Sequence, residues 1–188
     1  MSADRDRIEA ALQHGIDIMG RRIFLHGGVD EDTIGRAIRG LYLLDDLNAN
    51  PIELYVSSYG GELDEAFALH DVTRTITAPV HTIALGKCMS AAPMLVACGA
   101  KGHRYASEHT TFMLHDASLD CGEGSPALIS AHAESARESM RIYARLLGRY
   151  TKKPPAHWAR IFASKIDKYF TAEQAVAWGL VDQVWAEK

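Results

Sequence analysis

The sequence has few cysteines, and their arrangement suggests no structural role. Three cysteines occur among 188 residues, an odd number without the paired spacing of metal ligands. This excludes a disulfide framework or a zinc module as the basis of the fold. The nine histidines include no His-x-x-x-His pattern, so no metal site is predicted from them either.

Long apolar runs and a strong charge bias are absent as well. The apolar stretches are far shorter than a membrane span, and the N-terminal residues lack the apolar core of a signal peptide. The net charge is -4 with both signs mixed along the chain, which argues against a nucleic-acid surface. We therefore expect a cytoplasmic protein with reduced thiols that binds neither membrane nor nucleic acid.

The length and composition of the chain are typical of one globular domain. The length suits a single core, and 47% of the residues are hydrophobic. We expect residues 1–20 to form a flexible N-terminal arm and residues 21–188 to form the domain.

Apolar periodicity predicts alternating strands and helices in the first half of this domain. The predicted strands are residues 21–26, 52–56 and 80–85, and the predicted helices are residues 30–48, 62–77 and 91–98. This alternation is typical of an α/β fold with a largely parallel sheet core and packed helices.

The second half of the domain contains shorter elements around one long helix. The shorter elements are predicted strands at residues 104–105, 110–115, 168–170 and 181–185, the last at a sheet edge, and helices at 158–162 and 171–179. Residues 127–150 form the long helix, with Leu128, Ala131 and Leu146 among its face of apolar residues. Its many polar residues predict that it projects from the body or packs on a partner.

Ser90 lies where a predicted strand turns into a predicted helix. Such a position exposes the hydroxyl and directs the first free N–H groups of the helix at whatever the hydroxyl attacks. A serine nucleophile needs a nearby base and donors for the oxyanion. On this stretch alone a helix-capping serine is the more common role. Cys88, two residues earlier, is either a rival nucleophile or a small buried residue.

Other polar features stand at the ends of predicted elements. Gly60 and Gly61 permit either a close approach of the backbone to a ligand or a tight turn. His115 ends an apolar strand, where it is either a base facing a cleft or a structural histidine. Asp167 lies in a loop, where aspartates commonly act as caps.

These features fall within blocks that resemble the ClpP family, the proteolytic subunits of the Clp ATP-dependent serine proteases. The resemblance covers residues 21–184, and the order and spacing of the blocks are specific although each block alone is weak. The blocks include Ile23-Phe-Leu-His-Gly-Gly-Val29, Ile52-Glu-Leu-Tyr-Val-Ser-Ser-Tyr-Gly-Gly61, Gly86-Lys-Cys-Met-Ser90, Phe112-Met-Leu-His115 and Thr171-Ala-Glu-Gln-Ala-Val-Ala-Trp-Gly-Leu-Val-Asp182.

The resemblance implies a role for each candidate residue. Ser90 is then the nucleophile, His115 the general base, and Asp167 the acid that orients the histidine. The backbone N–H groups of Gly61 and Ala91 are then the oxyanion donors. The expected fold is the ClpP/crotonase-like superfold, with the long helix as a projecting handle.

The resemblance also implies partners. It implies a heptameric ring, stacked as a tetradecamer, that encloses the active sites and degrades unfolded proteins or short peptides. It implies a separate AAA+ unfoldase that feeds the ring, and no metal or cofactor. Residues 1–20 are then either axial pore loops or a cleaved pro-segment.

The sequence departs from the family near the expected site. Tyr59 replaces a proline beside the expected oxyanion donors, which predicts a looser loop. Asp116 follows the base, where we expect a second carboxylate to interact with His115 or to compete with Asp167 for it. Ile166 replaces an arginine used between rings, and Glu53 replaces an aromatic residue of the unfoldase docking pocket.

Four functions are therefore open. The first is a ClpP-type serine endopeptidase, and the second is a weak or inactive ring scaffold on the same fold. The third, a phage head-maturation protease, keeps the chemistry and changes the biological role. The fourth is a crotonase-like acyl-CoA enzyme, which shares the glycine-lined oxyanion hole and needs no Ser-His-Asp set.

Overall fold

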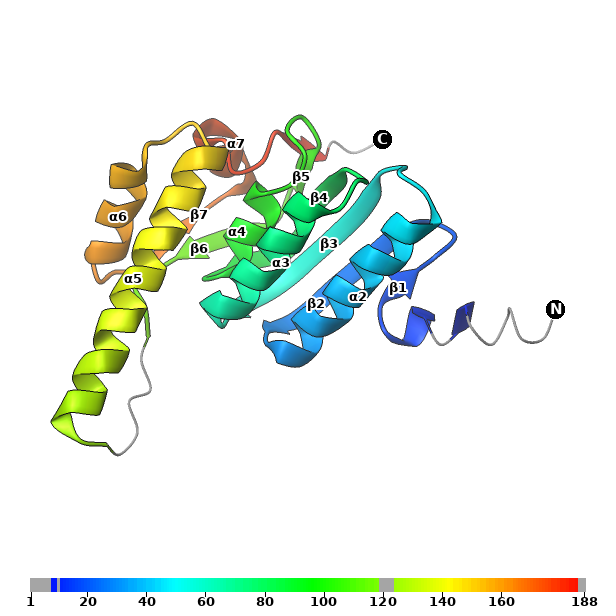
Figure 1. Cartoon of the computed structure of the whole chain (residues 1–188). Helices are drawn as coiled ribbons and strands as arrows, with labels where there is room; N and C mark the ends of the chain where they lie inside the picture. The colour runs from blue at the N-terminus through cyan, green and yellow to red at the C-terminus, as the bar shows by residue number, and fades with distance from the viewer. Residues whose placement is uncertain (1–7, 10, 119–123, 186–188) are drawn as a thin grey trace.

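The computed structural model describes residues 8, 9, 11–118 and 124–185 (Figure 1). Within these ranges eight strands form one sheet, whose main path runs β1-β2-β3-β4-β5-β8, with β6 beside β4 and β7 beside β6. The strands are β1 (Ile16–Asp17), β2 (Arg22–Val29), β3 (Ile52–Gly61), β4 (Val80–Met89), β5 (Arg104–Ser107), β6 (Thr111–Leu114), β7 (Lys168–Phe170) and β8 (Gln183–Trp185).

The sheet is parallel except at two of its pairings. The strands β2, β3, β4, β5 and β8 pair in parallel, as do β4 and β6, while β1–β2 and β6–β7 are antiparallel. The predicted α/β class with a largely parallel sheet is confirmed, and β8 lies at the sheet edge as predicted.

Helices fill the connections between the strands and cover the sheet (Figure 1). They are α2 (Glu31–Leu47), α3 (Leu63–Thr75), α4 (Ala92–Ala97), α5 (Pro126–Tyr150), α6 (Pro155–Ala163) and α7 (Ala172–Trp178). Local signals set their ends: Asp30 caps α2 by accepting from the Thr33 amide, and a capping box of Thr171 and Gln174 opens α7. Every residue of α4 is buried, so this short helix lies inside the core.

The strand β4 brings the candidate residues together because it changes neighbours along its length. Its first part pairs with β5 through Thr82–Ala84, and its last part pairs with β6 through Lys87–Met89. The carboxyl ends of β3, β4 and β6 therefore meet at one edge of the sheet, where parallel sheets commonly place their ligands.

The helix α5 projects from the body, as predicted (Figure 1). Its outer half is exposed, and ion pairs that join Glu134 and Glu138 to nearby arginines cover its surface. The predicted apolar face is confirmed only at Leu146, which packs against the core, because Leu128 is 47% exposed and the buried residues are Tyr143, Ala144 and Leu147. Only the base of the helix packs on the core, so its apolar residues do not form one buried face along the whole helix.

Several predicted boundaries differ from the structure. The strand β1 lies inside the segment 1–20 expected to form an arm, and Ile16 is buried where β1 pairs with β2. The strands β3 and β4 also continue beyond their predicted ends, to Gly61 and Met89. Their last residues include glycines and polar side chains, which hide a strand from apolar periodicity.

Candidate active site

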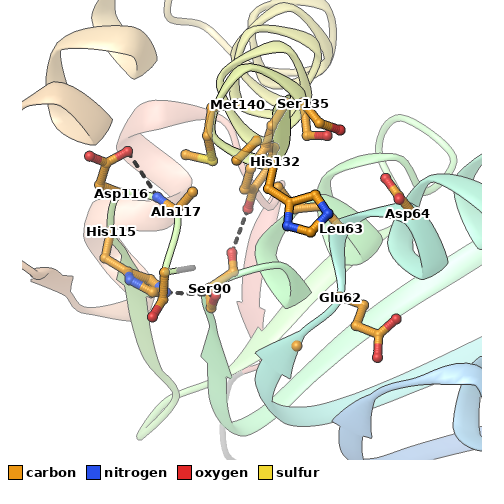
Figure 2. A pocket seen from close by; sticks show the side chains of 15 residues that line it. Glu62, Leu63, Asp64, Ser90, His115, Asp116, Ala117, His132, Ser135 and Met140 are labelled. Carbon is orange, nitrogen blue, oxygen red and sulfur yellow. Dashed lines mark hydrogen bonds between the residues drawn. The ribbon is translucent and has the colours of Figure 1, made fainter. Parts of the chain in front are cut away.

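Ser90 and His115 form a hydrogen-bonded pair at the edge of the sheet (Figure 2). The Ser90 Oγ atom lies 2.8 Å from Nε2 of His115, which is the distance of a nucleophile from its base. The Ser90 backbone N–H donates to the Met113 carbonyl at 2.8 Å, which ties the nucleophile to the strand before His115. The structure thus brings together the first two predicted site residues.

The backbone of Ser90 adopts a conformation that is unusual for its residue type. Its φ angle is 57°, in the left-handed region, where a residue with a side chain pays about 1–2 kcal/mol. At this sharp turn between β4 and α4 the hydroxyl meets His115, which directly follows β6. Such strain persists only where surrounding contacts hold it.

The first of the paired glycines is required because the backbone there lies close to Ser90. Gly60 has a φ angle of 95°, and a Cβ atom there would collide with Cβ of Ser90 and lie 2.9 Å from the Ala91 amide nitrogen. The Gly60 N–H donates to the buried Ser58 hydroxyl at 3.0 Å. Gly61 lines the same cavity as Ser90. The backbone of Gly60 thus lies directly against Ser90 and the Ala91 amide, and Gly61 follows it into the cavity.

Asp167 is not joined to the pair. It is exposed, and in the described part of the chain no hydrogen bond connects its carboxylate to His115. The last register pair of β6 and β7 is Leu114 with Lys168, so His115 and Asp167 occupy the next opposing positions. Asp116 does not replace Asp167 as a partner of the histidine, since its carboxylate accepts from the Ala117 amide at 2.8 Å.

Burial removes the cysteine alternative. Cys88 is fully buried, and this burial raises the pKa of its thiol far above the usual range. A thiol held protonated inside the core is neither accessible nor nucleophilic. Cys88 is therefore a small core residue, the second of the two roles considered for it.

A cavity of about 600 Å³ opens over the Ser90–His115 pair. Residues of the helix α5 between His132 and Tyr143 form one wall, and Glu62 and Asp64, which follow β3, lie on the other (Figure 2). The α5 residues that line it were not predicted, although their spacing of three and four is helical: His132, Ser135, Ala136, Ser139, Met140 and Tyr143. The cavity is large enough for side chains of an extended peptide.

Tyr59, in the place of the family's proline, makes a cation–π contact with Lys87. Tyr59 is 69% exposed, and its ring lies beneath the Lys87 ammonium, with Nζ 4.6 Å from the ring centroid. Tyr59 precedes the paired glycines and Lys87 precedes the nucleophile, so the contact joins the two sides of the site. A cation–π contact at an exposed position contributes about 0.5–1 kcal/mol.

Neither a metal cluster nor a membrane-spanning helix is present among the described residues. They contain no group of three or more histidine, cysteine or acidic side chains placed to hold a metal ion. Their helices include none that is both long and apolar enough to cross a membrane.

Comparison with known proteins agrees with this geometry. The family model described as Clp protease matches residues 13–188. The chain is also 31% identical over 185 residues to ATP-dependent Clp protease proteolytic subunit 1 of Protochlamydia amoebophila (strain UWE25). This alignment covers 95% of the chain and 84% of the relative.

Proposed function

The chain belongs to the Clp protease family, and on this premise we propose that it is a serine endopeptidase that cleaves unfolded proteins or short peptides inside a ring-shaped oligomer. The single observation that supports this most is the 2.8 Å hydrogen bond between Ser90 Oγ and His115 Nε2 at the floor of the cavity. The family assignment also supports the ClpP/crotonase-like superfold predicted from the sequence.

The first step of the proposed reaction is acylation of Ser90. His115 accepts the hydroxyl proton while Oγ forms a bond to the peptide carbonyl carbon. The carbonyl oxygen becomes an oxyanion, and the N–H groups of Gly61 and Ala91 are the proposed donors to it. The carbon–nitrogen bond then breaks, and His115 gives its proton to the departing amine.

The second step returns the enzyme to its resting state. Water attacks the acyl carbon, and His115 takes a proton from that water. The bond between the carbon and Ser90 Oγ breaks, and the proton passes back to Oγ as the carboxylic acid product leaves. Apart from the attacking water, which supplies one proton in the second step, the proposed donors and acceptors are side chains and amides of this chain.

We extend the proposal to assembly as a heptameric ring, stacked as a tetradecamer. Projection of α5 supports this, because its exposed outer half offers a surface for a facing ring (Figure 1). Ile166, in the place of the family's inter-ring arginine, is 72% exposed and available to an apolar contact instead. Enclosure would keep folded proteins from the nucleophile.

An AAA+ unfoldase is the proposed partner that supplies substrate. Aromatic rings at one side of the sheet support it: Phe24 stacks on Tyr55 at 5.0 Å, and Trp185 lies 6.1 Å from Tyr55. Glu53, which replaces an aromatic residue there, accepts a hydrogen bond from the Tyr55 hydroxyl at 2.8 Å. The substitution thus adds a charge to the cluster and occupies its tyrosine hydroxyl.

One observation favours the scaffold as a second candidate. Asp167 is exposed and makes no hydrogen bond to His115 in the described part of the chain. A histidine without its orienting acid is a weak base, so the ring would then serve as a scaffold or need a partner that aligns the site.

Peptide cleavage tests the two candidates directly. The assembled protein and Ser90→Ala are compared on fluorogenic peptides, and on an unfolded protein with and without an unfoldase and ATP. Cleavage by the wild type alone supports the peptidase. Assembly without any cleavage, with or without the unfoldase, would contradict the peptidase and support the scaffold.

A further inference from the structure

Tyr143 joins the base of the helix α5 to the nucleophile. Its side chain is 2% exposed and packs against Phe162, with ring centroids 5.1 Å apart. Its hydroxyl donates a hydrogen bond of 2.7 Å to the backbone carbonyl of Ser90. The bond spans 53 positions in the chain, so it is a tertiary contact made at the site.

The bonded carbonyl belongs to the same peptide group as a proposed oxyanion donor. The carbonyl of Ser90 and the N–H of Ala91 lie in one planar trans peptide unit and point in opposite directions. A donor that fixes the Ser90 oxygen therefore also fixes the direction of the Ala91 N–H. Rotation of this peptide plane would break the Tyr143 bond and turn the N–H away from the developing oxyanion.

The local chain offers little to hold this peptide group in place. Ser90 has a left-handed φ angle of 57°, and Ala91, the N-cap of α4, supplies no side-chain cap. Pro93 in the first turn has no N–H group. The Ser90 amide is held by the Met113 carbonyl at 2.8 Å, and the Tyr143 hydroxyl holds the other side of the turn.

The environment of Tyr143 keeps its hydroxyl a donor. Burial raises the pKa of the phenol well above its usual value, and interaction with the Met94 backbone amide opposes this rise only in part. Met94 is four residues beyond Ser90, so in a regular helix the Met94 N–H would bond to the Ser90 carbonyl. The Tyr143 hydroxyl interacts with both of these groups instead.

We propose that Tyr143 is a positioning residue of this site, whose hydroxyl holds the Ser90–Ala91 peptide group so that the Ala91 N–H points at the oxyanion. The inference rests on the proposed peptidase function and adds a residue to it. It also connects the orientation of the projecting helix to the oxyanion donor, because Tyr143 belongs to α5.

The test compares two tyrosines of the same helix. Tyr143→Phe removes the hydroxyl and keeps the ring, and the matched control Tyr150→Phe removes a hydroxyl bonded to His70 at 2.7 Å. We expect Tyr143→Phe to lower kcat by about 10- to 100-fold with KM nearly unchanged, because losing an oxyanion donor outright costs about 100- to 1,000-fold. Tyr150→Phe should change neither constant.

A peptide boronic acid provides a readout that a purely structural role would not move. It forms a tetrahedral adduct with the nucleophile, so its inhibition constant should rise for Tyr143→Phe by the same factor as kcat/KM falls. Neither KM nor an inhibition constant depends on the fraction of protein that is folded. Thermal melting and light scattering check that both variants fold and assemble.

The positioning role of Tyr143 and the proposed peptidase function can fail separately. An unchanged kcat for Tyr143→Phe, or a raised KM alone, would overturn the positioning role while the wild type remained a peptidase. A wild type that neither cleaves peptides nor reacts with a fluorophosphonate would overturn the proposed function, and the positioning role with it.

Discussion

His115 and Asp167 occupy opposing positions one step beyond the last register pair of β6 and β7, without a hydrogen bond between them in the described part of the chain. Residues at such positions in an antiparallel pair lie within reach of one another. The carboxylate therefore needs only a local rearrangement to bond the histidine. We expect this rearrangement to accompany assembly.

Replacing Asp167 tests whether it completes the site. In the assembled protein, Asp167→Asn should lower kcat by about 100- to 10,000-fold, because the histidine loses its orienting and charge-balancing partner. Peptide cleavage at pH 7 measures the effect.

Asp116→Asn is the matched control for that variant. Its carboxylate accepts from the Ala117 amide and makes no hydrogen bond to His115 in the described structure, so kcat should change little. A large loss in Asp116→Asn together with a small loss in Asp167→Asn would show that the neighbouring carboxylate orients the histidine instead.

Gly60→Ala should abolish activity, because the new side chain would displace Ser90 in addition to straining the backbone. Its φ angle of 95° disfavours any side chain, and the new Cβ would also press on Ser90. Gly102→Ala is the control, because Gly102 has a φ angle of 88° and open space around it. Both variants lose stability, measured by urea unfolding, but only Gly60→Ala should lose reactivity at Ser90. Equal loss of reactivity in both would show that general strain is the cause.

Asp182 gives stability a defined dependence on pH. Burial alone would raise the pKa of Asp182, but hydrogen bonds and charge from Arg104, and two backbone amides, hold it below the usual 3.8. The pair is largely buried, and Nη2 of Arg104 lies 2.6 Å from Oδ1 of Asp182. A lowered pKa stabilises the folded state fully above pH 3.8, and this contribution is lost as the pH falls through the lowered value.

Asp182→Asn should therefore reduce the free energy of unfolding by about 2 kcal/mol at pH 7. The difference from wild type in the free energy of unfolding should be smaller at pH 3, which lies below the usual 3.8, because the unfolded chain then binds a proton at this aspartate more readily than the folded chain does. Urea unfolding at both values, at one protein concentration, measures it. A difference that is as large at pH 3 as at pH 7 would contradict the assignment.

The sequence predicted most of the fold because its signals are local. The strand and helix order and the capping box at Thr171 follow from patterns within short windows. The strand β1 escaped prediction because two residues, Ile16 and Asp17, carry no periodicity. The ends of β3 and β4 escaped because their glycines and polar residues interrupt the apolar alternation.

The site residues that belong to sequence motifs were predictable, and those that reach the site only through tertiary contacts were not. Ser90 and His115 stand at recognisable element ends, and the structure places them 2.8 Å apart. The role proposed for Tyr143 has no local signal, because its partner is 53 positions away. The contact of Lys87 with Tyr59 likewise depends on two strand ends that meet only in the folded chain.

The central claim is that Ser90 is an activated nucleophile. The most direct test is the intact mass of the assembled protein after exposure to a fluorophosphonate, beside Ser90→Ala under the same conditions. We predict a single adduct per chain on the wild type and none on Ser90→Ala. An assembled wild type that gains no adduct, or a Ser90→Ala variant that gains the same one, would contradict the assignment of Ser90 as the nucleophile.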